Sequence, residues 1–287
     1  MNTSMRIGVG FGAVTLILAI AIGVVESQLP AVGAGALLYP SRMVMSRPLP
    51  HGCVEQTFTG VAVELRGWRC ATTAPRRGTI IYRHGIADNG GSAAGIVERF
   101  VPRGFDVIAY DSRAHGASTG NICTYGVLER QDLHRIMDQS GVPDAVLIGH
   151  SLGAAVALQA AAGEPRVRAV VSAATFSDLR SIAIERAPFF FSERSIAAAF
   201  ARTERDGGFL IDAASPLLAA ARISVPVLLI HGRSDTNTSS IHSQRVFDAL
   251  TGPKRLMVVP GAGHNDVLSS QVWNEIERWI EAVLVKS

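Results

Sequence analysis

The sequence has few charged residues and lacks any long run of them. Asp, Glu, Lys and Arg make up 18% of its 287 residues, against about 25% in typical soluble domains. The formal net charge is only +3, and nowhere do five Lys or Arg residues follow one another. Nucleic-acid-binding domains carry a basic patch or stripe, so we expect no nucleic-acid partner. Hydrophobic residues reach 48% of the chain, which excludes an intrinsically disordered protein.

Cysteine is also scarce, with three residues in the whole chain. Three are too few for a disulfide-rich scaffold, they do not show metal-ligand spacing, and the zinc motif H-E-x-x-H is absent. We therefore expect no metal site. Cys53 and Cys70 flank a β-patterned stretch with a turn near Thr59-Gly60. We hypothesise that they form a disulfide, as would suit an oxidising compartment; two unrelated buried thiols are the alternative.

One long hydrophobic run is present near the N-terminus. Residues 7–25 are nineteen residues without a charge, and as a helix they would span about 28 Å of a roughly 30 Å hydrocarbon core. Because Arg6 precedes the run, we expect a single-pass membrane anchor with the rest of the chain on the outer, periplasmic or extracytoplasmic side. The main alternative is a signal peptide cleaved near Ala34-Gly35-Ala36, which would give a secreted protein. A buried core helix is a third interpretation.

From residue 53 onward, strand-like apolar runs alternate with helix-like segments. This alternation predicts an α/β domain whose mostly parallel central sheet has helices on both faces. We assign residues 1–28 to the membrane anchor or signal segment, 29–52 to a connector and 53–287 to this domain. Residues 187–212 hold five of the eleven phenylalanines and predict a small cap inserted over the sheet. The predicted strands are 61–69, 79–83, 106–110, 144–149, 167–172, 225–230 and 255–259; the predicted helices are 92–102, 127–139, 152–163, 239–250 and 268–285.

The predicted strand 144–149 leads into Gly149-His150-Ser151-Leu152-Gly153 and then a helix of small residues. This is a G-x-S-x-G motif in the strand–turn–helix setting of a nucleophile elbow. The serine of such an elbow sits on a tight, strained turn, and glycines beside it avoid collisions with the neighbouring backbone. The sequence therefore predicts Ser151 as a nucleophile. The alternative, an ordinary Gly-Ser turn, lacks this flanking pattern.

A serine nucleophile needs a base, which in turn needs an acid to orient it. Asp235 follows the predicted strand 225–230, and His264 lies in a Gly-rich loop after the predicted strand 255–259. We predict Asp235 as the acid and His264 as the base. Asp111 and Asp266 are rival acids, but Asp111 precedes the serine in the chain and Asp266 is only two residues from His264.

The same chemistry needs an oxyanion hole, because hydrogen bonds to the tetrahedral oxyanion stabilise the transition state. We assign its donors to the backbone N–H groups of Leu152, directly after the serine, and of Ile86, after the predicted strand 79–83. A shift of the second donor from Ile86 to Ala87 is left open.

The order Ser151, Asp235, His264 resembles that of the α/β-hydrolase superfamily. The stretches RHGIADNGGS, AYDSRAHGAS, GHSLGAAVAL, SPLLAAARISVPVLLIHGRSD and PGAGHND are similar to its serine hydrolases. The similarity points to the branch of membrane-anchored bacterial hydrolases and prolyl-oligopeptidase-like or dienelactone-hydrolase-like esterases. It implies that the loop 110–116 braces the site, although Ala114 stands where relatives usually carry glycine.

The resemblance implies a serine hydrolase of carboxylesterase type that forms an acyl-enzyme without a cofactor. The expected substrate is a small ester or other acyl compound, with lipid-like esters among the candidates, and the expected membrane contact is the N-terminal helix. An exopeptidase or amidase with the same triad is the alternative. A catalytically silent, membrane-tethered binding domain is a further one.

Overall fold

The computed structural model describes residues 26–45 and 48–285. The predicted membrane-spanning run, residues 7–25, lies outside the described residues. Among the residues that are described, no helix is both long enough and apolar enough to cross a membrane.

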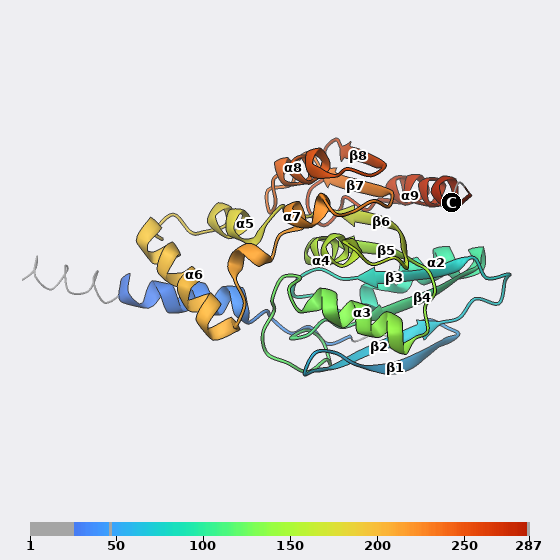
Figure 1. Cartoon of the computed structure of the whole chain (residues 1–287), viewed down its shortest axis with the longest axis horizontal. Coiled ribbons are helices and arrows are strands. Elements are labelled where there is room, and N and C mark those ends of the chain that lie inside the picture. Colours follow the sequence, from blue (N-terminus) through green and yellow to red (C-terminus); the bar gives the residue numbers. More distant parts are fainter. Residues whose placement is uncertain (1–25, 46–47, 286–287) are drawn as a thin grey trace, which may run out of the picture.

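A single twisted sheet forms the centre of the described part, with eight strands in the order β1-β2-β4-β3-β5-β6-β7-β8 (Figure 1). β2 pairs antiparallel with both of its neighbours, β1 and β4. From β4 through β3 and β5 to β8, each pair of neighbouring strands is parallel. The predicted mostly parallel sheet is thus confirmed. The strands are β1 (Cys53–Thr59), β2 (Glu64–Cys70), β3 (Gly78–Arg83), β4 (Phe105–Tyr110), β5 (Ala145–His150), β6 (Val167–Ala173), β7 (Val227–Gly232) and β8 (Lys254–Val259).

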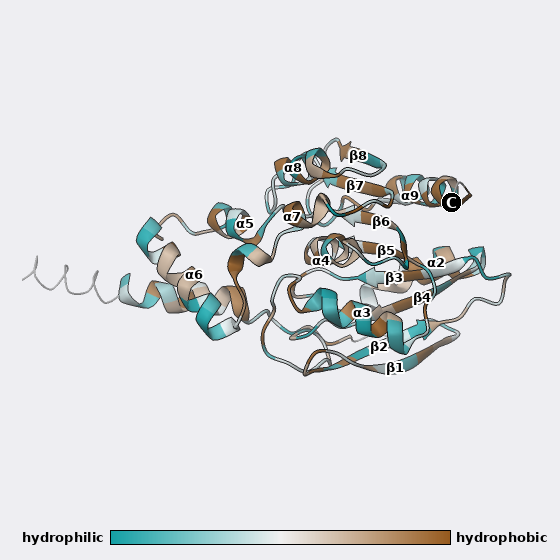
Figure 2. Cartoon of the chain, in the orientation of Figure 1, coloured by the Kyte–Doolittle hydropathy of each residue, from teal (hydrophilic) through white to brown (hydrophobic). Residues whose placement is uncertain are grey.

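Helices cover both faces of this sheet because its inner strands are apolar on both sides. Ile80 and Tyr82 of β3 pack with α2 (Ala94–Phe100) and α9 (Ser270–Val285), whereas Ile81 packs on the opposite face. That second face is covered by α3 (Glu129–Gln139), α4 (Leu152–Ala161), α7 (Pro216–Ala220) and α8 (Ile241–Ala249). Figure 2 shows β5 and β7 as mostly hydrophobic, while α3 and α6 carry both polar and apolar residues. Short 3₁₀ turns are η1 (Gly90–Ala93), η2 (Val101–Arg103) and η3 (Ile211–Ala213).

The antiparallel hairpin β1–β2 carries the disulfide. Its register places Cys53 opposite Cys70, and the two form a bridge, as hypothesised from their positions at the ends of the β-patterned stretch. Cys123 is a free, buried thiol. The bridge covalently joins β1, the edge strand of the sheet, to its neighbour β2.

The cap is larger than the insertion predicted at 187–212, and the connector is partly helical. The cap comprises α5 (Leu179–Glu185) and α6 (Glu193–Gly207), and a further helix over residues 26–38 packs against it. Leu29, Ala34 and Leu38 are buried on that helix, which explains why the segment is ordered rather than an extended connector. Figure 1 shows these three helices gathered at one end of the molecule, away from the C-terminus.

Candidate active site

The turn between β5 and α4 holds Ser151 in a backbone conformation that is rare outside glycine, with φ 54° and ψ −117°. The flanking glycines allow the turn to be this tight. A Cβ on Gly149 would lie 2.3 Å from the carbonyl oxygen of Gly153, and a Cβ on Gly153 would lie 2.1 Å from that of Arg83. Residues with side chains at these positions would force the backbone apart. The strain at Ser151 is therefore maintained by the packing of α4 against β3 and β5.

Three side chains from the carboxyl ends of three strands meet at this turn. The Ser151 Oγ lies 2.8 Å from Nε2 of His264, and Nδ1 of His264 lies 2.7 Å from Oδ2 of Asp235. Asp235 follows β7 and His264 follows β8. The structure thus places these predicted residues in one hydrogen-bonded chain, although 113 positions separate Ser151 from His264.

The rival carboxylates have other partners. Asp111 accepts hydrogen bonds from the backbone N–H groups of Gly90 and Ala117, and burial raises its pKa. Asp266 accepts the N–H of Gly263 at 2.6 Å. Both therefore support loops near the site, whereas the carboxylate beside the imidazole of His264 is that of Asp235.

The Asp235 carboxylate is held from several sides. Its Oδ1 accepts the backbone N–H groups of Asn237 and Thr238, each at 2.9 Å. Burial by itself raises the pKa of Asp235, but these hydrogen bonds and the contact with His264 outweigh burial and leave the pKa below its ordinary value. Buried His231 lies 3.3 Å from Oδ2 and donates from Nε2 to the Thr238 carbonyl, which closes the loop around the carboxylate.

The imidazole of His264 is kept neutral by its surroundings. Burial lowers its pKa most strongly, the hydrogen bond and charge of Asp235 raise it, and the nearby His150 and Arg186 lower it, so that the pKa lies below the ordinary value. The neutral ring can accept a proton at Nε2. His150 also donates from its own Nε2 to the backbone carbonyl of His264 at 2.8 Å, and so fixes the position of the loop.

Of the two residues assigned to the oxyanion hole, Leu152 directly follows Ser151 in the chain and Ile86 lines the same cavities as Ser151. Leu152 is the first residue of α4, where helix N–H groups have no partner within the helix. Ile86 lies on the loop after β3, and both cavities beside Ser151 have Ile86 in their walls. A Cβ on neighbouring Gly85 would come within 3.5 Å of the Ser151 Cβ, so this loop approaches the serine closely.

Ser151 lies where two cavities of different character meet. One has a volume of about 380 Å³ and runs beneath the cap between α5, α6 and the helix 26–38. The other, of about 640 Å³, opens on the side of His264 and is lined by Asp88, His150, Glu185 and Asn237. Arg186 lines both. The helix 26–38 and Arg186 were not singled out from the sequence, because no motif marks a residue that contributes to a site through a cap.

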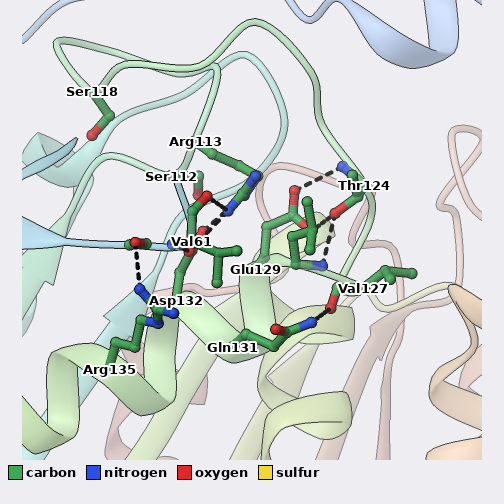
Figure 3. A network of polar contacts seen from close by, with 12 residues as sticks. Val61, Ser112, Arg113, Ser118, Thr124, Val127, Glu129, Gln131, Asp132 and Arg135 are labelled. Carbon is green, nitrogen blue, oxygen red and sulfur yellow. Dashed lines mark hydrogen bonds and ion pairs between the residues drawn. The ribbon is translucent and has the colours of Figure 1, made fainter. Parts of the chain in front are cut away.

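The loop after β4 is braced by a buried polar network (Figure 3). The Arg113 guanidinium makes a two-pronged ion pair with Asp132 of α3, and Asp132 also accepts the N–H of Val61. Glu129 accepts hydrogen bonds from Thr124 and from the N–H of Gly126. Tyr125 lies between Thr124 and Gly126 in the chain and lines the cavity beneath the cap. The loop thus positions a wall of the cavity without contributing to the hydrogen-bonded chain.

Known proteins share this architecture. The family model described as alpha/beta hydrolase fold matches residues 78–214, which contain the elbow and the β3 loop. The Pyrococcus furiosus esterase Pf2001 superimposes with a TM-score of 0.66 at 22% identity, over 86% of this chain and 98% of that one. The chain belongs to the α/β-hydrolase superfamily.

Curated relatives align with most of the sequence. Escherichia coli (strain K12) YfhR is 28% identical over 255 residues, 84% of each chain, and human alpha/beta hydrolase domain-containing protein 17B is 25% identical over 76% of this chain and 70% of its own. The Pyrococcus horikoshii acylaminoacyl peptidase superimposes with a TM-score of 0.63 at 15% identity, over 81% of this chain and 41% of that one. A second model, PhoPQ-activated pathogenicity-related protein, matches residues 196–287. Esterase and peptidase neighbours support a hydrolase, without distinguishing the bond that is cleaved.

Proposed function

We propose that this α/β hydrolase is a serine hydrolase that cleaves carboxylic esters through an acyl-enzyme intermediate. The observation that carries the proposal is the hydrogen-bonded chain from Ser151 Oγ through His264 to Asp235, at 2.8 and 2.7 Å. A hydroxyl, a neutral imidazole and an ionised carboxylate in this order form the arrangement that activates serine for attack on a carbonyl.

Acylation begins when Nε2 of His264 accepts the Ser151 proton as Oγ attacks the ester carbonyl. The N–H groups of Leu152 and Ile86 stabilise the tetrahedral oxyanion. Collapse breaks the ester bond, and the protonated His264 donates its proton to the leaving alcohol. His264 then takes a proton from water, whose oxygen attacks the acyl carbon, and the return of that proton to Ser151 releases the acid. Asp235 stabilises the imidazolium in both halves.

An amidase or exopeptidase with the same triad is the second candidate, and the acylaminoacyl peptidase among the structural neighbours supports it. The triad chemistry is common to both. An ester alcohol and an amide amine differ in how readily they leave, so a matched pair of an aminoacyl ester and its amide separates the two activities.

For location, we propose that residues 7–25 anchor the hydrolase in a membrane with its catalytic domain on the outer side. The composition of that run supports an anchor. A signal-peptidase cut near Ala34-Gly35-Ala36 would divide a helix whose Ala34 is 1% exposed, and would remove part of the cavity wall. The burial of this helix therefore favours the anchor over the cleaved signal peptide.

The substitution Ser151→Ala tests the proposed chemistry. We expect hydrolysis of p-nitrophenyl acetate to fall by at least about a thousandfold, and labelling by a fluorophosphonate probe to disappear. Ser224→Ala is the matched control, since Ser224 is exposed and lies before β7, at the opposite end of that strand from Asp235. A Ser151→Ala protein as active as the parent would contradict the proposal, and a parent protein that the probe does not label would favour the silent binding domain.

A further inference from the structure

The cavity beneath the cap is apolar almost throughout. Among the described residues that line it, Arg186 is the one charged side chain, and it stands at the boundary with the second cavity. Phe176, Ile182, Phe191 and Phe200 contribute much of the wall. A polar substrate group placed here would lose its hydration without gaining hydrogen bonds, whereas an alkyl chain would bury apolar area.

The position of His264 decides which part of a substrate enters which cavity. His264 lines the polar cavity and is not among the described residues that line the apolar one. The imidazole has to protonate the leaving oxygen, so the leaving group lies on its side of Ser151. The acyl group then extends to the other side, into the apolar cavity.

The apolar cavity also reaches the surface. Val32 and Phe190 both line it and are 59% and 55% exposed, which places an apolar opening between the helix 26–38 and the Phe-rich segment 188–191. The adjacent Phe189 is fully exposed. A chain longer than the cavity can therefore extend outward past apolar side chains, and the helix at this opening directly follows the hydrophobic run 7–25. Figure 1 shows that helix crossing the cap next to α6.

We propose that the apolar cavity is a binding site for long acyl chains, and that the substrates are esters joining such a chain to a small polar alcohol. This proposal rests on the proposed function and specifies its substrate class. Each methylene that finds room in the cavity contributes about 0.8 kcal/mol of burial, equivalent to about fourfold in kcat/KM. Polar groups of Asn237, Asn265 and Glu185 line the cavity that would receive the alcohol.

The test uses the full chain in phosphatidylcholine nanodiscs. For p-nitrophenyl acetate, butyrate, octanoate and dodecanoate, we expect kcat/KM to rise along the series. A second pair exchanges the two sides of the ester: glyceryl monododecanoate carries the long chain on the acyl side, and dodecyl acetate carries it on the leaving side. We expect the glyceryl ester to be hydrolysed at least tenfold more efficiently. A series that peaks at acetate or butyrate, or a preference for dodecyl acetate, overturns the proposal.

Variants that fill the cavity link the chain-length profile to these walls. Ala36 and Ala187 both line the cavity, so Ala36→Trp and Ala187→Trp should each lower the dodecanoate-to-acetate ratio of kcat/KM at least tenfold. Ala198→Trp is the matched control, because Ala198 is exposed on α6 and is not among the lining residues, and it should keep the parent ratio. An unchanged ratio in both folded cavity variants overturns the assignment of this cavity.

Failure of this proposal can be distinguished from failure of the proposed function. Fluorophosphonate labelling of Ser151 and hydrolysis of p-nitrophenyl acetate report on the triad and do not depend on chain length. If both are present while the parent shows no preference for long acyl chains, the substrate class is wrong and the esterase chemistry stands. If neither is present in folded parent protein, both proposals fail together.

Discussion

At the scale of single residues, the site depends on the pKa values of Asp235 and His264. The two side chains are hydrogen-bonded to each other, but their other surroundings differ. Backbone N–H groups and His264 surround Asp235 and keep its pKa low, so that it is ionised at neutral pH. Burial lowers the pKa of His264, so that it is neutral at the same pH. The two groups are thereby prepared for different roles before a substrate arrives.

The pH dependence of hydrolysis follows from this arrangement. A base has to be neutral, so kcat/KM should rise as pH rises through the pKa of His264. Because that pKa is lowered, the midpoint should lie below about 6.5, the ordinary histidine value, and the rate should be level around neutral pH. Arg186→Gln removes a cation that lowers the pKa and should move the midpoint upward. A parent midpoint above pH 7 in a kcat/KM profile would contradict this account.

At the scale of elements, the elbow requires the first turn of α4 to approach the ends of β3 and β5 closely. Gly153 makes this approach possible, because its α-carbon faces the backbone carbonyls of Arg83 and His84. Neighbouring α4 residues such as Ala154 and Ala155 are small and fully buried, which extends the same close packing along the helix.

A methyl group added at Gly153 should disturb this packing. Gly153→Ala would place Cβ 2.1 Å from the Arg83 oxygen, and we expect it to lower the free energy of unfolding by about 1–3 kcal/mol and to reduce activity. Gly95→Ala is the matched control: Gly95 lies in α2, is exposed and has no atom within 4 Å of an added Cβ. It should be neutral or stabilising by up to about 1 kcal/mol. Denaturant unfolding measures both, and equal effects would contradict the prediction.

At the scale of the whole molecule, the N-terminal helix, the cap and the α/β domain pack as one unit. Leu38 joins the three: its carbonyl accepts the N–H of Cys123 at 2.9 Å, and its side chain lies in a cluster with Phe200 and Phe209 of the cap region. Glu185 and Arg186 add polar contacts from the end of α5 to the loop that follows Asp235. The cap is thus attached to the loop that follows Asp235.

Removing the Leu38 side chain should weaken this unit. Leu38 is 1% exposed, and Leu38→Ala should cost about 2–5 kcal/mol of unfolding free energy because it leaves a cavity among packed side chains. The adjacent Tyr39 is 56% exposed, so Tyr39→Ala should change stability by less than about 0.5 kcal/mol. Thermal and denaturant unfolding of the two variants would show the difference. A Leu38→Ala protein as stable as Tyr39→Ala would mean that the helix 26–38 does not pack as described.

Much of the fold follows from local sequence pattern. The seven predicted strands overlap β2 to β8, because fully buried parallel strands are continuous apolar runs whose identity does not depend on distant partners. The β pattern between Cys53 and Cys70 also indicated the hairpin. Because the turn is short, it places the two cysteines opposite each other without help from distant residues. By contrast, α5 and α6 lie in a segment without regular alternation, and their position depends on long-range packing.

The sequence by itself determined the order of the strands along the chain and the elbow at Ser151, since both are written in contiguous residues. The tertiary structure alone decided that His264 Nε2 faces Ser151, that Asp235 rather than Asp111 or Asp266 faces His264, and that the helix 26–38 walls a cavity. These three features depend on which loops lie together at the carboxyl edge of the sheet and on which apolar faces pack against one another. Such contacts join residues that are far apart in the chain, so no local pattern encodes them.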